Sequence, residues 1–307
     1  MPTAELHQSP SLPALHSNGV PLSNAPSRLG WLPATRPTTP MPELRRQFHE
    51  QGCLLVKGLL PRADILSHRA EFFAFMAAAG ILEPGTDPAD GICRRDPQAE
   101  PLARKLLMEW VRSARYEKFC MHERLVGFMD DFLEGLSYLH KRKIIRYTRP
   151  RDAASTGAHY DLVYIRGGTE RLVTAWIPIG DVPVHMGGLV YLEGSHTLGR
   201  TMEAEFAAAN ADLTPDERVS AYNKNMAAGG WLTKNLAELA DKFDARWLMA
   251  DYEAGDVMLH SPYMIHAATA NEATDGRMRL STDIRYQRVS DEIDARWANH
   301  WSLDDML

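Results

Sequence analysis

The chain is poor in cysteine, and its three cysteines form no recognisable disulfide or metal-binding pattern. Cys53, Cys93 and Cys120 are widely spaced in a chain of 307 residues and include no CxxC pair. An odd, scattered set of this kind indicates reduced thiols in an intracellular protein and argues against a zinc site built on cysteine. This scarcity therefore predicts a cytoplasmic protein.

Long apolar runs and an excess of positive charge are also missing. No segment approaches the roughly 18 consecutive apolar residues that a membrane-spanning helix needs. The N-terminus lacks the basic region and the apolar core of a secretory signal. The formal net charge is -6, whereas the surface that binds a nucleic acid is basic. Neither a membrane nor a nucleic acid is therefore expected as a partner.

Proline is unevenly distributed and marks off the N-terminal segment. Residues 1–42 hold nine of the nineteen prolines, with Ser, Thr and Asn between them. Such a composition buries too little apolar surface to offset the entropy of ordering, which predicts a disordered or loosely draped arm. Residues 43–290 are expected to form a single domain, and residues 291–307 a C-terminal tail that contains Trp297 and Trp301.

Short β patterns dominate the domain. The runs RLVTAWIPI and GLVYLEG, and a strand expected at 142–149, are separated by Gly and Pro turns. Several such strands in a row indicate a sandwich or barrel, and the double-sheet jelly roll of cupins fits best. Helical periodicity at 61–79 and 100–135 places helices on its outside, and residues 200–245 predict a helical insertion. The expected fold is mainly β with flanking helices, a double-stranded β-helix.

The stretch TGAHYDLVYIRGGTERLVTAW, residues 156–176, contains a His-x-Asp triplet. Side chains two positions apart in a strand leave the backbone on the same face, so His159 and Asp161 can point at one spot. One imidazole and one carboxylate are two thirds of the ligand set that holds non-haem Fe(II) on one face. A bare triplet is common, so this interpretation requires a third ligand.

A third ligand and a partner for an anion are available about a hundred residues later. The segment DYEAGDVMLHSPYMIHAATANEATDGRMRLSTDIRYQ reads as a strand, a turn and two further strands. His266 lies near its middle, and His260 is an alternative ligand six residues earlier. Arg279 can bind a carboxylate through two parallel hydrogen bonds. Ser281 shares its face of the strand and can bind a remaining oxygen.

Taken together, these segments resemble the phytanoyl-CoA dioxygenase family of Fe(II)- and 2-oxoglutarate-dependent oxygenases. The resemblance extends from about Leu44 to about Arg288. It rests on the opening FHEQGCLLVKGLLP, the HxD strand, the Trp-x-Pro-x-x-Asp and Gly-Ser-His segments, the distal His, and the closing Arg-x-Ser. The resemblance implies an iron ion held by His159, Asp161 and His266.

The same resemblance implies a site for 2-oxoglutarate. Arg279 and Ser281 would anchor its far carboxylate, and Trp176 stands where relatives place a Trp beside this cosubstrate. Arg146, on the strand before the HxD segment, is a candidate for lining the same pocket, although an Arg on a half-exposed strand usually faces water. The family pattern also favours His266 over His260, because it places the ligand about a dozen residues before the anchoring Arg.

The implied activity is an oxygenase that uses 2-oxoglutarate and O2 and releases succinate and CO2. Its expected reaction is hydroxylation of an unactivated C–H bond in a metabolite or natural-product intermediate. Asp161 favours hydroxylation, since halogenating relatives carry a small residue in its place. The alternatives are desaturation or ring formation, and a cupin-like binding protein without catalysis. A zinc hydrolase is disfavoured because no HExxH pair occurs and because zinc usually leaves a single open position.

Overall fold

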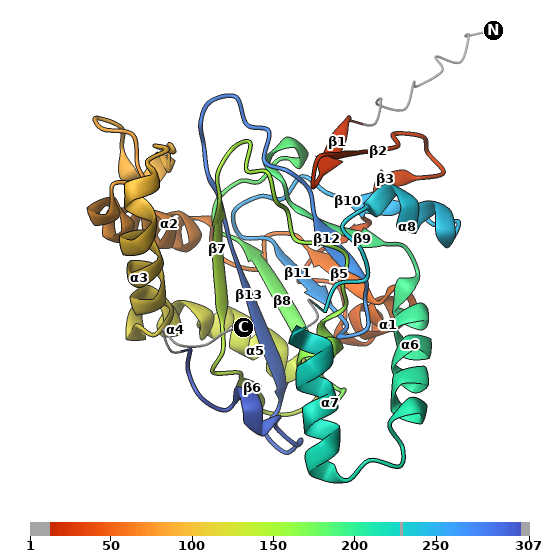
Figure 1. Ribbon diagram of the computed structural model, residues 1–307. Helices are drawn as coiled ribbons and strands as arrows, with labels where there is room; N and C mark the ends of the chain where they lie inside the picture. The colour runs from red at the N-terminus through yellow and green to blue at the C-terminus, as the bar shows by residue number, and fades with distance from the viewer. Residues whose placement is uncertain (1–12, 228–229, 302–307) are drawn as a thin grey trace, which may run out of the picture.

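The computed structural model describes residues 13–227 and 230–301. Its core consists of two sheets of mostly antiparallel strands, with helices around them (Figure 1). The larger sheet has the order β4-β5-β11-β8-β13-β6, with β7 also paired to β13, and the smaller has the order β12-β9-β10-β3. This arrangement confirms the predicted two-sheet architecture with flanking helices.

The strands are short, apart from β8 and β13. Those of the larger sheet are β4 (Ala34–Thr35), β5 (Cys53–Val56), β6 (Ser137–Leu139), β7 (Ile144–Thr148), β8 (Val173–Pro178), β11 (Val257–His260) and β13 (Arg279–Arg288). Those of the smaller sheet are β3 (Leu29–Trp31), β9 (Leu189–Leu192), β10 (Trp247–Met249) and β12 (His266–Ala268).

Strand register gives β13 a polar inner face and a largely apolar outer face. Leu280 and Ile284 of β13 pack into the core shared with the helices. Because side chains alternate along a strand, the intervening positions of β13 face the smaller sheet. These are Arg279, Ser281, Asp283 and Arg285. The inner face of the longest strand therefore carries only polar and charged side chains as far as Arg285.

Five helices cover the outer face of the larger sheet (Figure 1). They are α1 (Met41–Gln51), α2 (Arg62–Met76), α3 (Glu100–Val111), α4 (Ala114–Cys120) and α5 (Glu123–Leu133). Gly52 ends α1 in the left-handed conformation with φ of 73°, as its position after FHEQ predicts. Among the described residues, no helix has the length and apolar character needed to span a membrane.

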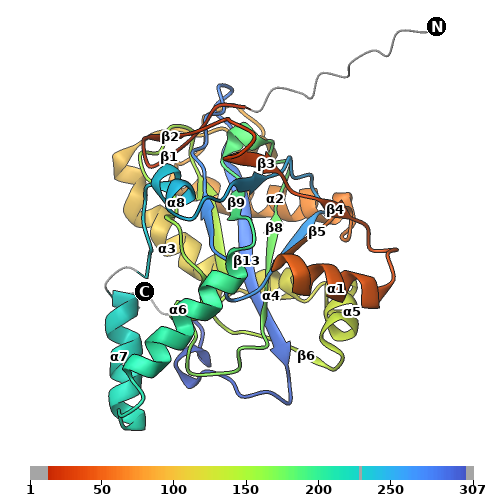
Figure 2. The same cartoon turned by 90° about the vertical axis from the view of Figure 1, so that its right-hand side faces the viewer.

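Three further helices form the insertion between β9 and β10. They are α6 (Ser195–Ala209), α7 (Pro215–Ala227) and α8 (Leu236–Lys242). Figure 2 shows α6 and α7 side by side, extending beyond the sheets, and the rings of Phe206 and Tyr222 lie 6.1 Å apart between them. The first of these helices starts slightly before residue 200, where the sequence predicts the insertion to begin.

The prediction of a disordered arm is wrong for residues 13–42, while residues 1–12 lie outside the described part. Strands β1 (Leu15–Ser17) and β2 (Val20–Leu22) form a hairpin. Its turn is Asn18-Gly19, with φ of 51° and 78°, which is the two-residue turn that suits a hairpin. The arm then adds β3 beside β10 and β4 beside β5, both in parallel. Buried leucines and pairing with free strand edges order this segment. Its proline-rich composition gave no indication of either.

The C-terminal tail packs on the body of the protein through its two tryptophans. The indole N–H of Trp297 donates to the Tyr164 carbonyl at 2.6 Å, and that of Trp301 donates to the Lys143 carbonyl at 2.8 Å. The Arg142 guanidinium lies over both rings, 4.9 and 4.7 Å from their centroids. These contacts explain the presence of Trp297 and Trp301 by simple packing.

The packing of the arm can be tested at Leu29, which is 1% exposed in β3. We expect Leu29→Ala to lower the free energy of unfolding by about 3 kcal/mol, because it leaves a cavity in a packed core. Urea denaturation followed by circular dichroism measures the change. Leu136→Ala is the matched control, since Leu136 is 73% exposed and should change stability little. Equal stabilities of the two variants would show that the arm is not packed.

Candidate metal centre

His159 and His266 are paired directly across two chain segments. The His159 N–H donates to the His266 carbonyl at 3.0 Å, and the His266 N–H donates to the His159 carbonyl at 2.9 Å. This isolated bridge replaces the longer strand expected for the HxD segment, and Asp161 already begins a short 3-10 helix, Asp161–Tyr164. The pairing places the two imidazole rings side by side, with centroids 4.4 Å apart.

The structure brings His159, Asp161 and His266 into one buried cluster. Each offers one ligand atom, and these atoms all lie within 4.8 Å of one another. The Nδ1 atoms of His159 and His266 lie 2.9 Å from the carbonyls of Gly157 and Met264 respectively. Because a carbonyl only accepts, each Nδ1 carries the hydrogen and each Nε2 keeps a lone pair. Both Nε2 atoms face Asp161 Oδ1, at 3.9 and 4.0 Å.

The charge states of the three groups suit a divalent cation. Burial lowers the pKa of His159 and of His266, so both imidazoles are neutral at neutral pH. Burial by itself would raise the pKa of Asp161, but the Arg285 guanidinium holds it well below its usual value. Two neutral nitrogen donors and one carboxylate are therefore present without any change of protonation.

Three residues around Asp161 were not identified from the sequence as neighbours of its carboxylate. Arg285 donates to Oδ1 at 3.1 Å, and Thr174 donates to Oδ2 at 2.5 Å. His260, the alternative third ligand, lies outside the cluster, with its Nε2 atom 3.4 Å from Oδ2. The sequence did contain a signal for two of them, because residues an even number of positions apart on a strand share a face. Arg285 lies six residues after Arg279, and Thr174 lies two residues before Trp176.

Arg279 and Ser281 form a second polar group on the same inner face. Arg279 donates to the Thr148 hydroxyl at 2.8 Å and to the Gly187 carbonyl. Burial lowers its pKa to about 10, which leaves it cationic at neutral pH. Among the described residues, Arg279 Nε and Ser281 Oγ are buried without a hydrogen-bond partner. Such atoms are costly in a protein interior, and a bound carboxylate would satisfy both.

The other two predicted cosubstrate residues also lie on the inner face. Trp176 is opposite Asp283 in the register, and its ring packs 4.7 Å from that of Tyr252. Arg146 is opposite Ser281 on β7. Its side chain is 49% exposed, and its Nε lies 3.7 Å from Asp283 Oδ2. Arg146 is thus the more accessible of the two.

A cavity of about 430 Å³ opens beside Arg279. Arg146 and Thr148 of β7 line it, together with Ala268 at the end of β12 and residues of α3. Ala268 lies two residues after His266, but the three clustered residues His159, Asp161 and His266 do not themselves line the cavity. Its volume is large enough for a small dicarboxylate beside Arg279.

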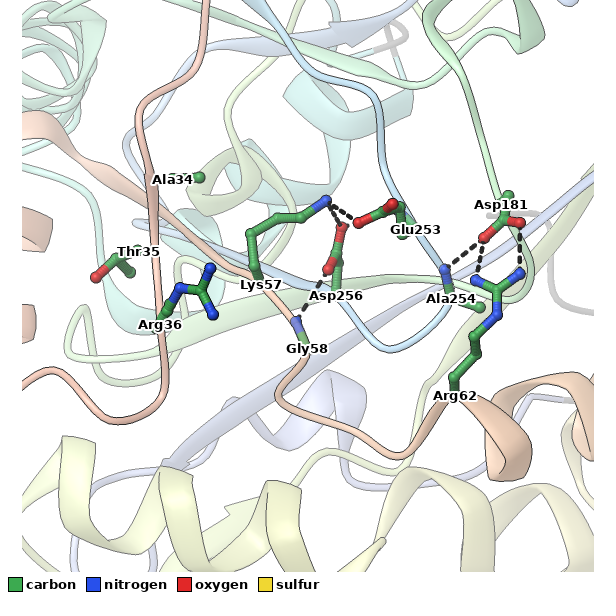
Figure 3. A pocket seen from close by; sticks show the side chains of 10 residues that line it. All are labelled: Ala34, Thr35, Arg36, Lys57, Gly58, Arg62, Asp181, Glu253, Ala254 and Asp256. Carbon is green, nitrogen blue, oxygen red and sulfur yellow. Dashed lines mark hydrogen bonds and ion pairs between the residues drawn. The ribbon is translucent and has the colours of Figure 1, made fainter.

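A second depression, of about 760 Å³, lies elsewhere on the surface (Figure 3). Lys57 contacts Asp256 at 2.6 Å and Glu253 at 2.8 Å, and Arg62 contacts Asp181 at 2.5 Å. These charges neutralise one another within the depression. Arg279 does not line it but does line the smaller cavity, so the smaller cavity is the candidate site.

The helical insertion is attached to the HxD segment by a buried ion pair. Glu203 of α6 accepts from the Tyr160 hydroxyl at 2.6 Å and from Arg166 at 2.6 and 2.8 Å. The end of the insertion also pairs with this segment, since the Ala158 N–H donates to the Thr233 carbonyl at 2.8 Å. The insertion therefore lies against the residues that flank His159.

Comparison with known proteins identifies one family. The family model for phytanoyl-CoA dioxygenase matches residues 48–279, about three quarters of the chain. The 1-deoxypentalenic acid 11-beta-hydroxylase of Streptomyces arenae is 25% identical over 263 residues, which cover 80% of this chain and 81% of the relative. The same enzyme from Streptomyces exfoliatus is 24% identical over 254 residues, with the same coverage.

Solved structures share the fold at low sequence identity. The non-haem alpha-ketoglutarate-dependent epimerase SnoN from nogalamycin biosynthesis has a TM-score of 0.54 at 18% identity, over 82% of this chain and 84% of that one. EctD from S. alaskensis, solved with 2-oxoglutarate and 5-hydroxyectoine, has a TM-score of 0.54 at 15% identity, over 95% and 88%. Both support the cupin-like fold of this chain.

The Glu203 network yields a stability prediction. Glu203→Gln removes the buried carboxylate to which Arg166 donates, so we expect the free energy of unfolding to fall by about 3 kcal/mol. Glu205→Gln on the exposed side of the same helix is the control and should change stability little. Urea denaturation compares the two variants. Similar midpoints would contradict an energetic link between the insertion and the HxD segment.

Proposed function

This chain belongs to the phytanoyl-CoA dioxygenase family of Fe(II)- and 2-oxoglutarate-dependent oxygenases, and we propose that His159, Asp161 and His266 hold its iron. The observation that carries this proposal is the convergence of their three ligand atoms in one buried cluster. Two imidazoles and one carboxylate on one side of a metal are typical of non-haem Fe(II) oxygenases and leave the opposite positions open. The open positions are those that a bidentate oxoacid and O2 require.

The cosubstrate 2-oxoglutarate is proposed to lie between the metal and Arg279. Its far carboxylate would be held by the guanidinium of Arg279 and the hydroxyl of Ser281, whose buried atoms lack a partner among the described residues. Trp176 would flank it from β8. Arg146 would line the same pocket from β7, because it stands directly opposite Ser281.

The proposed reaction is hydroxylation of a C–H bond in a small molecule. When bound, Fe(II) with 2-oxoglutarate and O2 supplies an oxidation that releases succinate and CO2 and inserts one oxygen atom into the substrate. The chain contributes binding, orientation and exclusion of water. Asp161 remains in the ligand set, which supports hydroxylation, and its low pKa keeps it ionised for the metal.

The substrate class is proposed to be a metabolite or a natural-product intermediate. Both curated relatives are named as hydroxylases of 1-deoxypentalenic acid, a small organic acid. The insertion α6–α8 is proposed to cover the substrate, because it contacts the segment that carries His159. A cytoplasmic location stays a prediction of the sequence.

The metal and the cosubstrate can be tested separately under anaerobic conditions. We expect Mn(II) to bind the purified protein, and 2-oxoglutarate to bind only after the metal, both measured by calorimetric titration. His266→Ala should abolish Mn(II) binding, because it removes one of three ligands. Arg279→Gln should leave Mn(II) binding intact but weaken 2-oxoglutarate binding at least about 100-fold, because a buried charge-assisted pair is lost.

Arg277→Gln is the matched control for that experiment. Arg277 lies two residues before Arg279, but its side chain is 45% exposed and pairs with Asp275. We expect its 2-oxoglutarate affinity to equal that of the wild type. Loss of 2-oxoglutarate affinity in Arg277→Gln but not in Arg279→Gln would show that Arg277, and not Arg279, binds the far carboxylate. No 2-oxoglutarate binding by the metal-loaded wild type would favour the non-catalytic binding protein.

The reaction type is decided by product mass. A panel of natural-product acids, incubated with Fe(II), 2-oxoglutarate and labelled O2, should give a product that contains one labelled oxygen atom. Succinate release should depend on the same substrate, with Asp161→Ala as the inactive control. A product that lacks two hydrogens and carries no label would instead identify desaturation or ring formation.

A further inference from the structure

One row across the larger sheet brings three side chains to Asp161, and two of them, Thr174 and Arg285, donate hydrogen bonds to it. In the strand register, Thr174 of β8 lies opposite Arg285 of β13 on one side and opposite His260 of β11 on the other. All three side chains are buried and face the smaller sheet. Three neighbouring strands therefore each place one side chain next to the Asp161 carboxylate.

The two oxygens of Asp161 have different surroundings. Oδ2 receives the Thr174 hydroxyl at 2.5 Å and lies 3.4 Å from both Arg285 Nε and His260 Nε2. Among the described residues, Oδ1 receives only the terminal nitrogen of Arg285, at 3.1 Å, and it is the oxygen nearest to Nε2 of His159 and of His266. One oxygen is therefore occupied by the protein, and the other faces the metal position.

We infer that Arg285 and Thr174 are positioning residues that restrict Asp161 to coordination through Oδ1 alone. The inference rests on the proposed function, because it concerns the metal held by His159, Asp161 and His266. Coordination through both oxygens would require Oδ2 to leave its donors. Thr174 would then keep a buried hydroxyl without this acceptor, which is costly.

This restriction preserves the open positions of the metal. With one oxygen of Asp161 and two imidazoles, three positions are used and three stay free for the oxoacid and O2. A second Asp161 oxygen would take one of them. Arg285 suits the task better than lysine, since its planar guanidinium reaches both oxygens at once. His260 is itself oriented, because its Nδ1 lies 3.1 Å from the Tyr191 hydroxyl.

The cleanest test changes the hydroxyl of Thr174 and nothing else. Thr174→Val keeps the shape of the side chain and removes the donor, whereas Thr174→Ser keeps the donor. Both variants are titrated with Co(II), whose visible absorption reports coordination number and geometry. We expect Thr174→Val to weaken Co(II) binding about 10-fold and to alter the spectrum. Thr174→Ser should resemble the wild type in both respects.

A second pair of variants tests the guanidinium. Arg285→Lys keeps the charge but loses the planar fork, so we expect Co(II) affinity to fall about 10- to 100-fold with an altered spectrum. Arg288→Lys, on the same strand but bound to the Leu133 carbonyl, is the matched control and should not change either quantity. Thermal unfolding of the metal-free variants verifies that each is folded before titration.

The outcomes separate this inference from the proposed function. Wild-type affinity and spectrum in both Thr174→Val and Arg285→Lys would overturn the inference while leaving the metal centre in place. Absence of Co(II) binding by the wild type, or binding that His266→Ala does not weaken, would overturn the proposed function and the inference with it. Weakened binding with an altered spectrum in either donor variant, and not in its control, supports the inference.

Discussion

The two backbone hydrogen bonds between His159 and His266 are the constraint on which the metal centre depends. Directly opposite residues of an antiparallel pair carry their side chains close together on one face, so this single bridge brings two imidazoles from distant parts of the chain to one point. Asp161, two residues after His159, lies beside them at the start of a short 3-10 helix. Loss of the bridge would separate the histidines, whatever the rest of the fold retained.

The space between the sheets is polar at the metal centre and apolar beside it. Buried charges there are paired, as Asp161 is with Arg285, because an unpaired charge in a protein interior is strongly unfavourable. Arg279 Nε and Ser281 Oγ are among the buried polar atoms that lack a partner in the described part of the chain. A bound carboxylate would satisfy both atoms, which is why the cosubstrate is proposed to bind there.

Segments outside the two sheets converge on the residues around the HxD triplet. The insertion reaches them through Glu203 and Tyr160, and the C-terminal tail reaches them through Trp297 and the Tyr164 carbonyl. A short 3-10 turn has little stability of its own, since its hydrogen bonds are few and poorly aligned. Contacts from several directions compensate for this weakness and keep the ligand-bearing segment in one conformation.

The sequence by itself determined the types of ligand and which residues of one strand share a face, because alternation along a strand is a local property. His266 and the anchoring pair after it follow from such patterns and from the family resemblance. Only the tertiary structure decided that His260 contacts the far oxygen of the carboxylate, that Arg285 and Thr174 join it there, and that residues 13–42 pair with strand edges. Those facts depend on register between strands and on which edges remain free, and such contacts between distant segments leave no period in the sequence.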